Sequence, residues 1–318
     1  MGTTKSSLRR ATYAKFFCLL VLLLIQQGPT VPMQWQIQLG KPLLLQKNIE
    51  LQKTVTVPVP IQYSKQVPEL TAESYIVYDV QTPSILTMKN ERRRLFPAST
   101  TKMMTALVAM ENYSLDTIVT ITQEDDALGS SMNLHAGEQM TVANLLYGTL
   151  VKSGNDAAYA LASAHPQGYN GFVLAMNARA QSLGMTSTEY GNVSGVEQGD
   201  QSNITTVRDT ALLAAEGMKN PLFRQIVQTK RIVIADVSGK SKHDLTSTNE
   251  LLGAVDGVIG IKTGWTDAAG ECLVTYTSRN NHDVITVMLN SADRFGETRQ
   301  LIDWAFTNFE WKTAELPQ

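Results

Sequence analysis

A serine and a lysine three positions apart are the first residues whose types and spacing could do chemistry. In the run Ser99-Thr100-Thr101-Lys102, the offset stacks the two side chains on one face of a helix. A hydroxyl is a weak nucleophile unless a neighbour takes its proton, and a lysine does so only where burial or nearby positive charge favours its neutral form. The run predicts Ser99 as nucleophile and Lys102 as base, in a site with another cation, for which Lys262 is the candidate.

A second polar motif, Ser153-Gly154-Asn155, follows a predicted helix and contains the glycine of a tight turn. Its hydroxyl and carboxamide could relay a proton to a leaving amine and hydrogen-bond a substrate amide. A third motif, Lys262-Thr263-Gly264, lies on a predicted strand.

The third motif precedes Trp265. Gly264 would let a ligand approach the backbone, and Lys262 would offer charge to a carboxylate. Taken singly, the three motifs are also compatible with a helix cap, an ordinary turn and an edge strand. Together they occur in the order SxxK, SxN, KTG, which is typical of penicillin-binding proteins and related β-lactamases.

The elements that must position these motifs can be read from the periodicity of apolar residues. Alternating patterns predict strands at Ser74–Val80, Ser84–Met88, Arg231–Val237, Gly260–Gly264, Glu271–Ser278 and Val284–Leu289. Helical spacing predicts a helix from Ser99, one capped by Thr141, and others at Asn155–Ala164, Gly171–Leu183, Val207–Met218 and Thr298–Phe309. Helices fill the middle and strands gather near both ends, which indicates an α+β domain with antiparallel hairpins.

Composition excludes several classes of function. The 27 Lys and Arg against 29 Asp and Glu leave a net charge of −2, and no basic stripe follows the first residues, so we expect no nucleic-acid partner. The four histidines and two cysteines are scattered and form no metal-ligand spacing. Because fixed donors can meet the charge that develops on an amide, we expect neither a metal nor an organic cofactor.

The amino-terminal residues have the pattern of a targeting segment. Four basic residues precede the apolar run Phe16–Ile25, which is the layout of an export signal, although a membrane anchor is also compatible with it. Residues from about 31 to 70 are rich in Pro, Gln and Lys and predict a spacer. We therefore expect a signal peptide or anchor at 1–30, a spacer at 31–70 and one domain at 71–318. The protein is expected on the outer face of the membrane or in the cell envelope.

Longer stretches resemble one family, the low-molecular-mass D-alanyl-D-alanine carboxypeptidases of peptidase family S11, which are penicillin-binding proteins. The stretches are SYIVYD, FPASTTKMMTALVAME, TVANLLYGTLVKSGNDAAYALA, MNARAQSLGM, LFRQIV, TSTNELL and GIKTGWTDAAGECLV. The resemblance implies a β-lactamase/transpeptidase-like fold, an antiparallel sheet flanked by helices with a helical lobe inserted mid-chain. It also implies peptidoglycan stem peptides as substrates and β-lactam antibiotics as covalent inhibitors.

The resemblance further implies a role for each motif residue. Ser99 would form the acyl-enzyme, and Ser153 would protonate the departing D-alanine. Asn155 would orient the acyl side, and Lys262 with Thr263 would hold the terminal carboxylate. Backbone N–H groups of Ser99 and Trp265 would form the oxyanion hole.

Three other interpretations remain open at this stage. A DD-endopeptidase would share every catalytic group, and a non-catalytic β-lactam-sensing or wall-binding module would share the fold. A β-lactamase is also conceivable, since Glu216 and Asn220 mimic the spacing of its deacylating base. Two departures from the family pattern stand out. The run Glu189–Asn192 stands in place of Thr-His-Phe-x-Asn. No second β domain is expected after the first, so any membrane contact is expected at the amino terminus.

Overall fold

The computed structural model of the chain describes residues 54–60, 66–122 and 129–315. Within these ranges, no helix has the length and apolar character needed to cross a bilayer. The run Phe16–Ile25 lies outside the described residues, as do positions 31–53 and 61–65 of the predicted spacer. The structural description therefore begins with the carboxyl-terminal part of that spacer.

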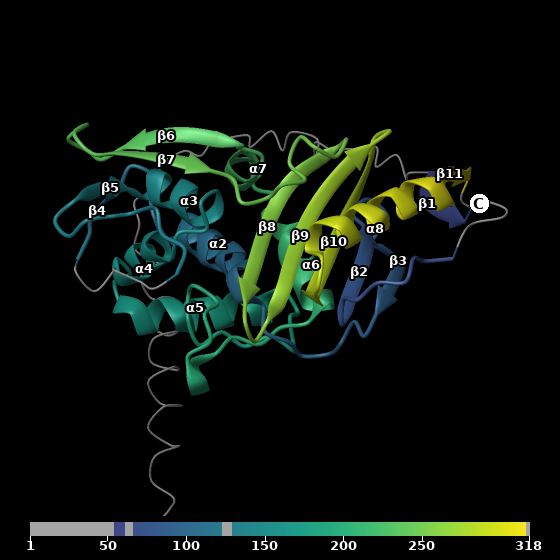
Figure 1. The fold of residues 1–318 in the computed structure, drawn as a ribbon, viewed down its shortest axis with the longest axis horizontal. Coiled ribbons are helices and arrows are strands. Elements are labelled where there is room, and N and C mark those ends of the chain that lie inside the picture. Colours follow the sequence, from purple (N-terminus) through teal and green to yellow (C-terminus); the bar gives the residue numbers. More distant parts are fainter. Residues whose placement is uncertain (1–53, 61–65, 123–128, 316–318) are drawn as a thin grey trace, which may run out of the picture. The chain divides into compact units, whose positions relative to one another are not determined.

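A five-stranded antiparallel sheet runs through the domain in the strand order β3, β2, β10, β9, β8 (Figure 1). Its strands are β2 (Ser74–Asp79), β3 (Ser84–Lys89), β8 (Val258–Thr266), β9 (Gly270–Arg279) and β10 (His282–Ser291). The early strand β2 pairs with the late strand β10, with Val77 opposite Thr286. Because this pairing joins both ends of the domain, the intervening chain must leave the sheet and return to it.

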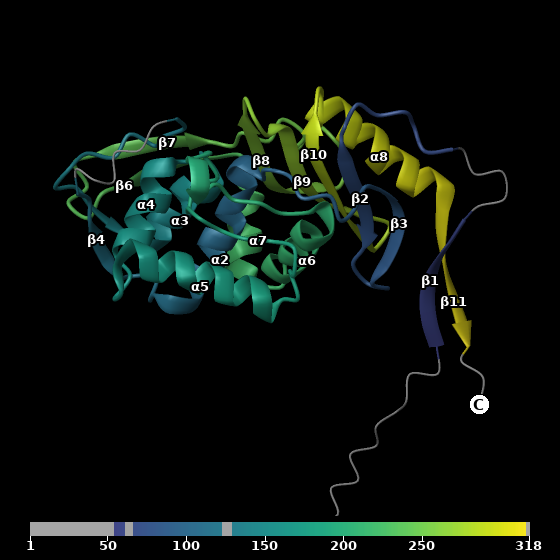
Figure 2. The same ribbon diagram turned by 90° about the horizontal axis from the view of Figure 1, so that it is seen from below.

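Each face of the sheet has its own apolar core, because successive residues of a strand point to opposite faces. Val77 and Met288 pack on one face with Leu301 and Ala305 of α8 (Arg294–Asn308). Ile76 belongs to the other core, which includes α2 (Lys102–Asn112) and α6 (Val207–Gly217). Figure 2 shows α8 on one side of the strands and α2 and α6 on the other. The expected antiparallel sheet flanked by helices is confirmed.

A helical lobe occupies the chain between β3 and β8. It contains α3 (Val142–Leu150), α4 (Asn155–Ser163), α5 (Gly168–Ser182), α7 (Pro221–Val227), and the short 3₁₀ helices η1 (Ala98–Thr101) and η3 (Gly199–Gln201). Two hairpins flank it, β4 (Ile118–Thr120) with β5 (Gln139–Thr141), and β6 (Arg231–Ala235) with β7 (Lys242–Thr246). Thr141 caps α3 as predicted, since its side chain accepts a hydrogen bond from Asn144 N.

The predicted elements agree with the structure to within a few residues, but several short elements were missed. The helix expected at Ser99 starts as the 3₁₀ turn η1, and α2 proper begins at Lys102. Strands β4, β5, β7 and β11 (Phe309–Glu315) and helix α7 were not predicted. Elements this short show few periods, so the spacing of their apolar residues identifies some of them and misses others.

One strand lies where the sequence predicts a spacer. β1 (Thr54–Pro60) pairs in antiparallel fashion with β11 (Phe309–Glu315), which continues directly from α8. Both strands lie at the end of the domain marked by the carboxyl terminus (Figure 1). The spacer interpretation was therefore wrong for these seven residues. The alternating Thr and Val of β1 are a strand pattern that the two prolines obscured, and proline is tolerated on such an edge.

A buried carboxylate fastens the start of the domain to α8. Glu297 accepts hydrogen bonds from the backbone N–H groups of Thr71 and Ala72 and from the Ser291 hydroxyl. Burial on its own would raise the pKa of Glu297, but these hydrogen bonds outweigh it and hold the pKa below its ordinary value. A depressed carboxyl pKa adds stability that is present above the unfolded-state pKa and is lost as the pH falls through the folded-state pKa.

We therefore predict that Glu297→Gln lowers the free energy of unfolding at pH 7 by about 2 kcal/mol. The difference from wild type should shrink as the pH falls below about 4, where the unfolded-state carboxyl becomes protonated. Urea unfolding at several pH values measures both effects. A difference that stays constant between pH 7 and pH 3 would contradict the assignment.

Candidate active site

The hydroxyl of Ser99 and the amine of Lys102 are in contact. Nζ of Lys102 lies 2.8 Å from Oγ of Ser99 and donates a second hydrogen bond of 2.8 Å to the carbonyl oxygen of Ser194. Ser99 lies in η1 and Lys102 opens α2, so the predicted three-residue offset brings them together across one turn. Ser99 is partly exposed, whereas Lys102 is fully buried. The nucleophile candidate is open to a ligand and its partner amine is not.

The surroundings of Lys102 favour a neutral amine. Burial, and then the nearby charge of Lys262, lower the pKa of Lys102 well below its ordinary value, although Asp156 acts in the opposite sense. A neutral amine has a lone pair that can accept the hydrogen of the Ser99 hydroxyl. The predicted requirement for a second cation is met by the residue that the sequence suggested.

The second motif forms the turn into α4. Ser153 is buried, with a positive φ of 63°, a backbone region that few residues other than glycine adopt. Its Oγ accepts a hydrogen bond of 2.8 Å from Nζ of Lys262. Asn155 is buried at the start of α4, and its backbone N–H donates to Ser130 O at 2.7 Å. The turn thus holds the Ser153 hydroxyl against a lysine that lies more than a hundred residues away in the chain.

The third motif lies on β8, next to η1. Lys262 is buried and donates to Thr263 O at 2.9 Å, and the Thr263 hydroxyl lies 2.6 Å from that of Thr248. Burial, and then the nearby charge of Arg294, lower the pKa of Lys262 to about 7. The lysine is therefore poised to exchange a proton near neutral pH, and a bound carboxylate would favour its charged form.

Gly264 makes the close approach between β8 and η1. A Cβ atom at this position would lie 3.0 Å from the Ser99 backbone nitrogen, 3.0 Å from Ala98 Cβ and 3.1 Å from Pro97 O. A side chain here would be tighter than ordinary van der Waals contact, so glycine lets β8 run close to the Ser99 N–H group without a shift of η1. The next residue, Trp265, has an exposed side chain. The structure thus brings all eight predicted site residues onto neighbouring segments: η1 and the first residue of α2, the turn into α4, and β8.

Arg294 lies beside the candidate site residues, and the sequence did not reveal it. It opens α8, and its Nη1 donates to Gly264 O at 2.9 Å. Its charge acts on Lys262, which places a guanidinium beside the carboxylate-binding candidates. No local motif surrounds this arginine, because the chain makes a hairpin of two strands between Gly264 and α8. A search for an arginine shortly after the last sheet strand is the one signal that could have suggested it.

The two residues that suggested a β-lactamase have structural roles. Glu216 forms ion pairs with Arg179 at 2.7 Å and with Lys219 at 3.0 Å. Asn220 caps α7 by accepting from the backbone N–H groups of Leu222 and Phe223. Among the described residues, no group of three or more His, Cys, Asp or Glu side chains is arranged to hold a metal ion.

Comparison with known proteins agrees with this geometry. A family model described as D-alanyl-D-alanine carboxypeptidase matches residues 61–293. The chain is 31% identical over 260 residues to the D-alanyl-D-alanine carboxypeptidase DacF of Bacillus subtilis, covering 78% of this chain and 66%, just under two thirds, of that protein. It is 33% identical over 239 residues to a D-alanyl-D-alanine endopeptidase of Pseudomonas aeruginosa, covering 74% and 75%.

A solved structure gives the same result. A D-alanyl-D-alanine carboxypeptidase from Mycobacterium tuberculosis superposes with a TM-score of 0.74 at 30% sequence identity, covering 81% of this chain and all of that one. The β-lactamase/transpeptidase-like architecture expected from the sequence is confirmed by such neighbours.

The pKa of Lys102 can be tested through its neighbour. Because the charge of Lys262 lowers that pKa, we predict that Lys262→Met moves the acid limb of the pH profile for Ser99 acylation to higher pH. The limb should stay below the ordinary lysine pKa, since burial is the larger cause. The rate of acylation by a small neutral ester, which carries no carboxylate for Lys262 to bind, measures this. A limb that stays in place or moves to lower pH would contradict the electrostatic coupling.

Proposed function

Since the chain belongs to the D-alanyl-D-alanine carboxypeptidase family, peptidase family S11, we propose that it removes the terminal D-alanine from peptidoglycan stem peptides through an acyl-enzyme on Ser99. The observation that carries the proposal is the contact of 2.8 Å between a partly exposed serine hydroxyl and a fully buried lysine amine. Such a pair supplies a nucleophile together with a base whose burial favours its neutral form.

The first half of the reaction forms an ester. Neutral Lys102 takes the proton of the Ser99 hydroxyl as Oγ attacks the carbonyl carbon between the two D-alanines. The negative charge that develops on the carbonyl oxygen is met by the backbone N–H groups of Ser99 and Trp265, which the close approach at Gly264 supports. The C–N bond then breaks, and the departing amine takes a proton from Ser153 Oγ, which Lys262 can replace across their hydrogen bond of 2.8 Å.

The second half of the reaction releases the shortened peptide. Lys102 first passes on the proton that it took from Ser99, which restores the charge of Lys262. Water then attacks the ester carbonyl, its proton passes to the neutral Lys102 amine, and the Ser99 oxygen leaves with that proton. Asn155 orients the acyl side of the substrate throughout. No metal or organic cofactor takes part in these steps.

The substrate also determines where the enzyme works. Peptidoglycan lies outside the cytoplasm, so the proposal includes export, with residues 1–30 as signal peptide or membrane anchor and residues 71–318 as the peptidase domain. β-Lactam antibiotics are expected to acylate Ser99 and inhibit the enzyme. The intact set of catalytic groups favours this function over a β-lactam sensor without turnover.

The proposal is tested by incubating the purified protein with labelled penicillin and with a stem pentapeptide. Wild type should bind the drug covalently and release free D-alanine, and Ser99→Ala should do neither, because no other group can form the ester. Retained folding of the variant is checked by circular dichroism. Covalent labelling that survives the substitution would remove Ser99 from the mechanism.

A DD-endopeptidase is the second candidate, and the relative from Pseudomonas aeruginosa that bears this name favours it. Both activities use the same acyl-enzyme and differ in the leaving group, a free D-alanine or the cross-linked stem of another strand. Digestion of defined cross-linked dimers beside pentapeptides separates them. Faster cleavage of dimers would assign the endopeptidase activity.

Arg294 is proposed to bind the terminal carboxylate together with Lys262 and Thr263. A charge-assisted hydrogen bond lost from a buried site costs about 1.5–3 kcal/mol, so Arg294→Leu should lower kcat/KM for the pentapeptide by about 10- to 150-fold. Acylation by a neutral ester should change much less. Equal losses with both substrates would show that the arginine supports the fold of the site and not the carboxylate.

A further inference from the structure

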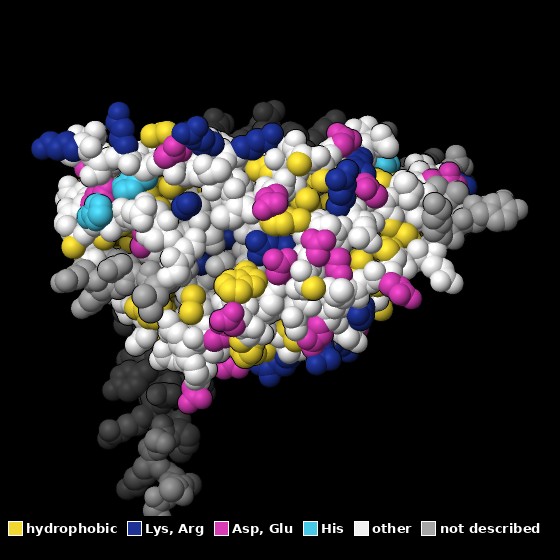
Figure 3. Space-filling model, viewed as in Figure 1, with side chains coloured by type: hydrophobic (Ala, Val, Ile, Leu, Met, Phe, Trp, Pro, Cys, Tyr) yellow, Lys and Arg dark blue, Asp and Glu magenta, His cyan; other side chains and the backbone are white. Residues whose placement is uncertain are grey.

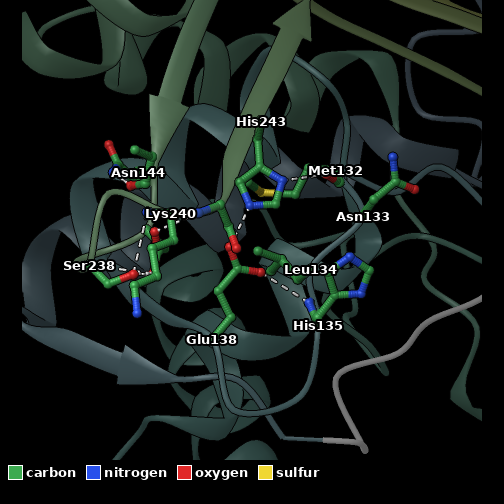
Figure 4. Close-up of polar contacts among 12 residues, drawn as sticks. Met132, Asn133, Leu134, His135, Glu138, Asn144, Ser238, Lys240 and His243 are labelled. Carbon is green, nitrogen blue, oxygen red and sulfur yellow. Dashed lines mark hydrogen bonds and ion pairs between the residues drawn. The ribbon is translucent and has the colours of Figure 1, made fainter.

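A buried pair of histidine and glutamate lies near the catalytic turn and takes no part in the proposed chemistry. Nε2 of His243 lies 2.6 Å from Oε1 of Glu138, and both side chains are more than nine-tenths buried. Nδ1 of His243 lies 2.9 Å from the carbonyl oxygen of Met132. Figure 4 shows the ring between these two partners, with the other carboxylate oxygen of Glu138 accepting from His135 N at 3.1 Å.

The chemistry of these partners fixes the orientation of the ring. A carbonyl oxygen can only accept, so Nδ1 carries a hydrogen and donates it to Met132 O. The short contact on the other side then holds one more proton, between His243 Nε2 and the Glu138 carboxylate. The carboxylate therefore keeps the imidazole in the tautomer and orientation that can hold the carbonyl, as carboxylates do behind other functional histidines.

Met132 lies in a segment, residues 131–135, that belongs to no helix or strand. Hydrogen bonds hold it on two sides. Its carbonyl is bound by His243, and its N–H donates to both carboxylate oxygens of Asp156 at 3.1 Å. Asp156 also accepts from the Ser131 hydroxyl at 2.6 Å and from Leu134 N at 3.1 Å. A residue fixed at both its N–H and its C=O cannot shift without moving one of its partners.

One of those partners, Asp156, adjoins the catalytic turn. Asp156 directly follows Asn155, whose N–H donates to Ser130 O at 2.7 Å, and the Ser130 hydroxyl donates to the carbonyl of Lys152 at 3.0 Å. The segment 130–134 therefore touches the residues on both sides of Ser153. Since Ser153 has a backbone conformation that it does not favour by itself, its surroundings must maintain that conformation.

The 130–134 segment borders a cavity into which it could move if the histidine were lost. A cavity of about 430 Å³ lies beside the ring, lined by Met132, Asn133, His135, Lys152, Ser241, Lys242, His243 and Asp244. Histidine and basic side chains are visible at this end of the molecule in Figure 3. The ionisable groups around the pair are thus His135, Lys152 and, on β7 itself, Lys242 and Asp244. Because this side of the ring faces the cavity, side-chain packing there cannot take the place of the hydrogen bond from His243 to Met132 O.

We propose that His243, oriented by Glu138, is a positioning residue that holds the 130–134 segment and through it the Ser153-Gly154-Asn155 turn in its catalytic geometry. The inference rests on the proposed function, because its readout is acylation of Ser99. The β6 and β7 hairpin contributes no catalytic group, but through His243 it would support the site that the three motifs form.

Two substitutions at one position separate the two contacts of the ring. An asparagine amide nitrogen lies as many bonds from Cα as Nδ1 of histidine, and a glutamine amide nitrogen as many as Nε2. His243→Asn should keep the hydrogen bond to Met132 O and acylate Ser99 with penicillin within about threefold of the wild-type rate. His243→Gln should lose that bond and acylate about tenfold more slowly or worse, the expected effect of one hydrogen bond to a buried carbonyl.

A matched pair at Glu138 keeps the test decisive if His243→Gln does not fold. Glu138→Gln can still hydrogen-bond Nε2 of His243 and should acylate close to the wild-type rate, whereas Glu138→Leu leaves the ring unoriented and should be slow. Glu297→Gln is the stability control, since it removes a buried carboxylate on the α8 side of the sheet. It should lower the melting temperature without slowing acylation.

The outcomes separate this inference from the proposed function. Rates that follow the identity of the retained contact, and not the melting temperature, support a positioning role. Wild-type rates in His243→Gln and Glu138→Leu, or losses that follow the melting temperature across all five variants, would overturn it. If the wild type does not react with penicillin, the proposed function itself fails, and that result appears before any variant is compared.

Discussion

The burial of the Lys102 amine is the constraint on which the site depends. An ammonium group removed from water loses its hydration, and the single carbonyl of Ser194 replaces only part of it. The neutral amine is the form that the surroundings favour, and that form makes Ser99 a nucleophile. The backbone around Ser194 is fastened to η1, since Asn203 donates to the Thr101 hydroxyl at 2.9 Å and to the carbonyl of Asn192 at 3.0 Å. The packing of the helical lobe thus keeps water away from the Lys102 amine.

The sheet supplies what the helical lobe lacks, a second cation on a rigid strand. Lys262 lies on β8, which is hydrogen-bonded along its length to β9, and its charge acts on Lys102 while its hydrogen bond reaches Ser153. The charge of Arg294 in turn lowers the pKa of Lys262. Like charges packed side by side destabilise one another, and a bound carboxylate would relieve that repulsion. Substrate binding and proton transfer are therefore connected through Lys262, whose charge acts on Lys102 and which lies beside Arg294.

Backbone conformations that residues do not favour occur on both sides of the site. Ala98, which precedes the nucleophile, has a φ of 45°, and Ser153 has a φ of 63°. Gly195 lies against Ala98, where a Cβ atom would come within 1.8 Å of its carbonyl oxygen. Such conformations persist only where the surroundings determine them, which is the reason for the dense hydrogen bonding of the neighbouring loops. The contacts of Asp156 and His243 are part of that support at the Ser153 side.

The sequence by itself determined what depends on neighbours along the chain. Helical spacing placed Lys102 beside Ser99, and Thr141 marked a helix start. Apolar alternation predicted β2 in full and the central residues of β3, β8, β9 and β10. The three motifs, with the tryptophan that follows the third, also identified the eight site residues that the fold gathers. The tertiary structure alone decided which distant groups meet: Lys262 with Ser153, Arg294 with Gly264, and His243 with Met132 and Glu138. These contacts join segments 30 to 111 residues apart, and no local periodicity encodes them, because their geometry follows from the pairing of strands and the packing of the lobe against the sheet.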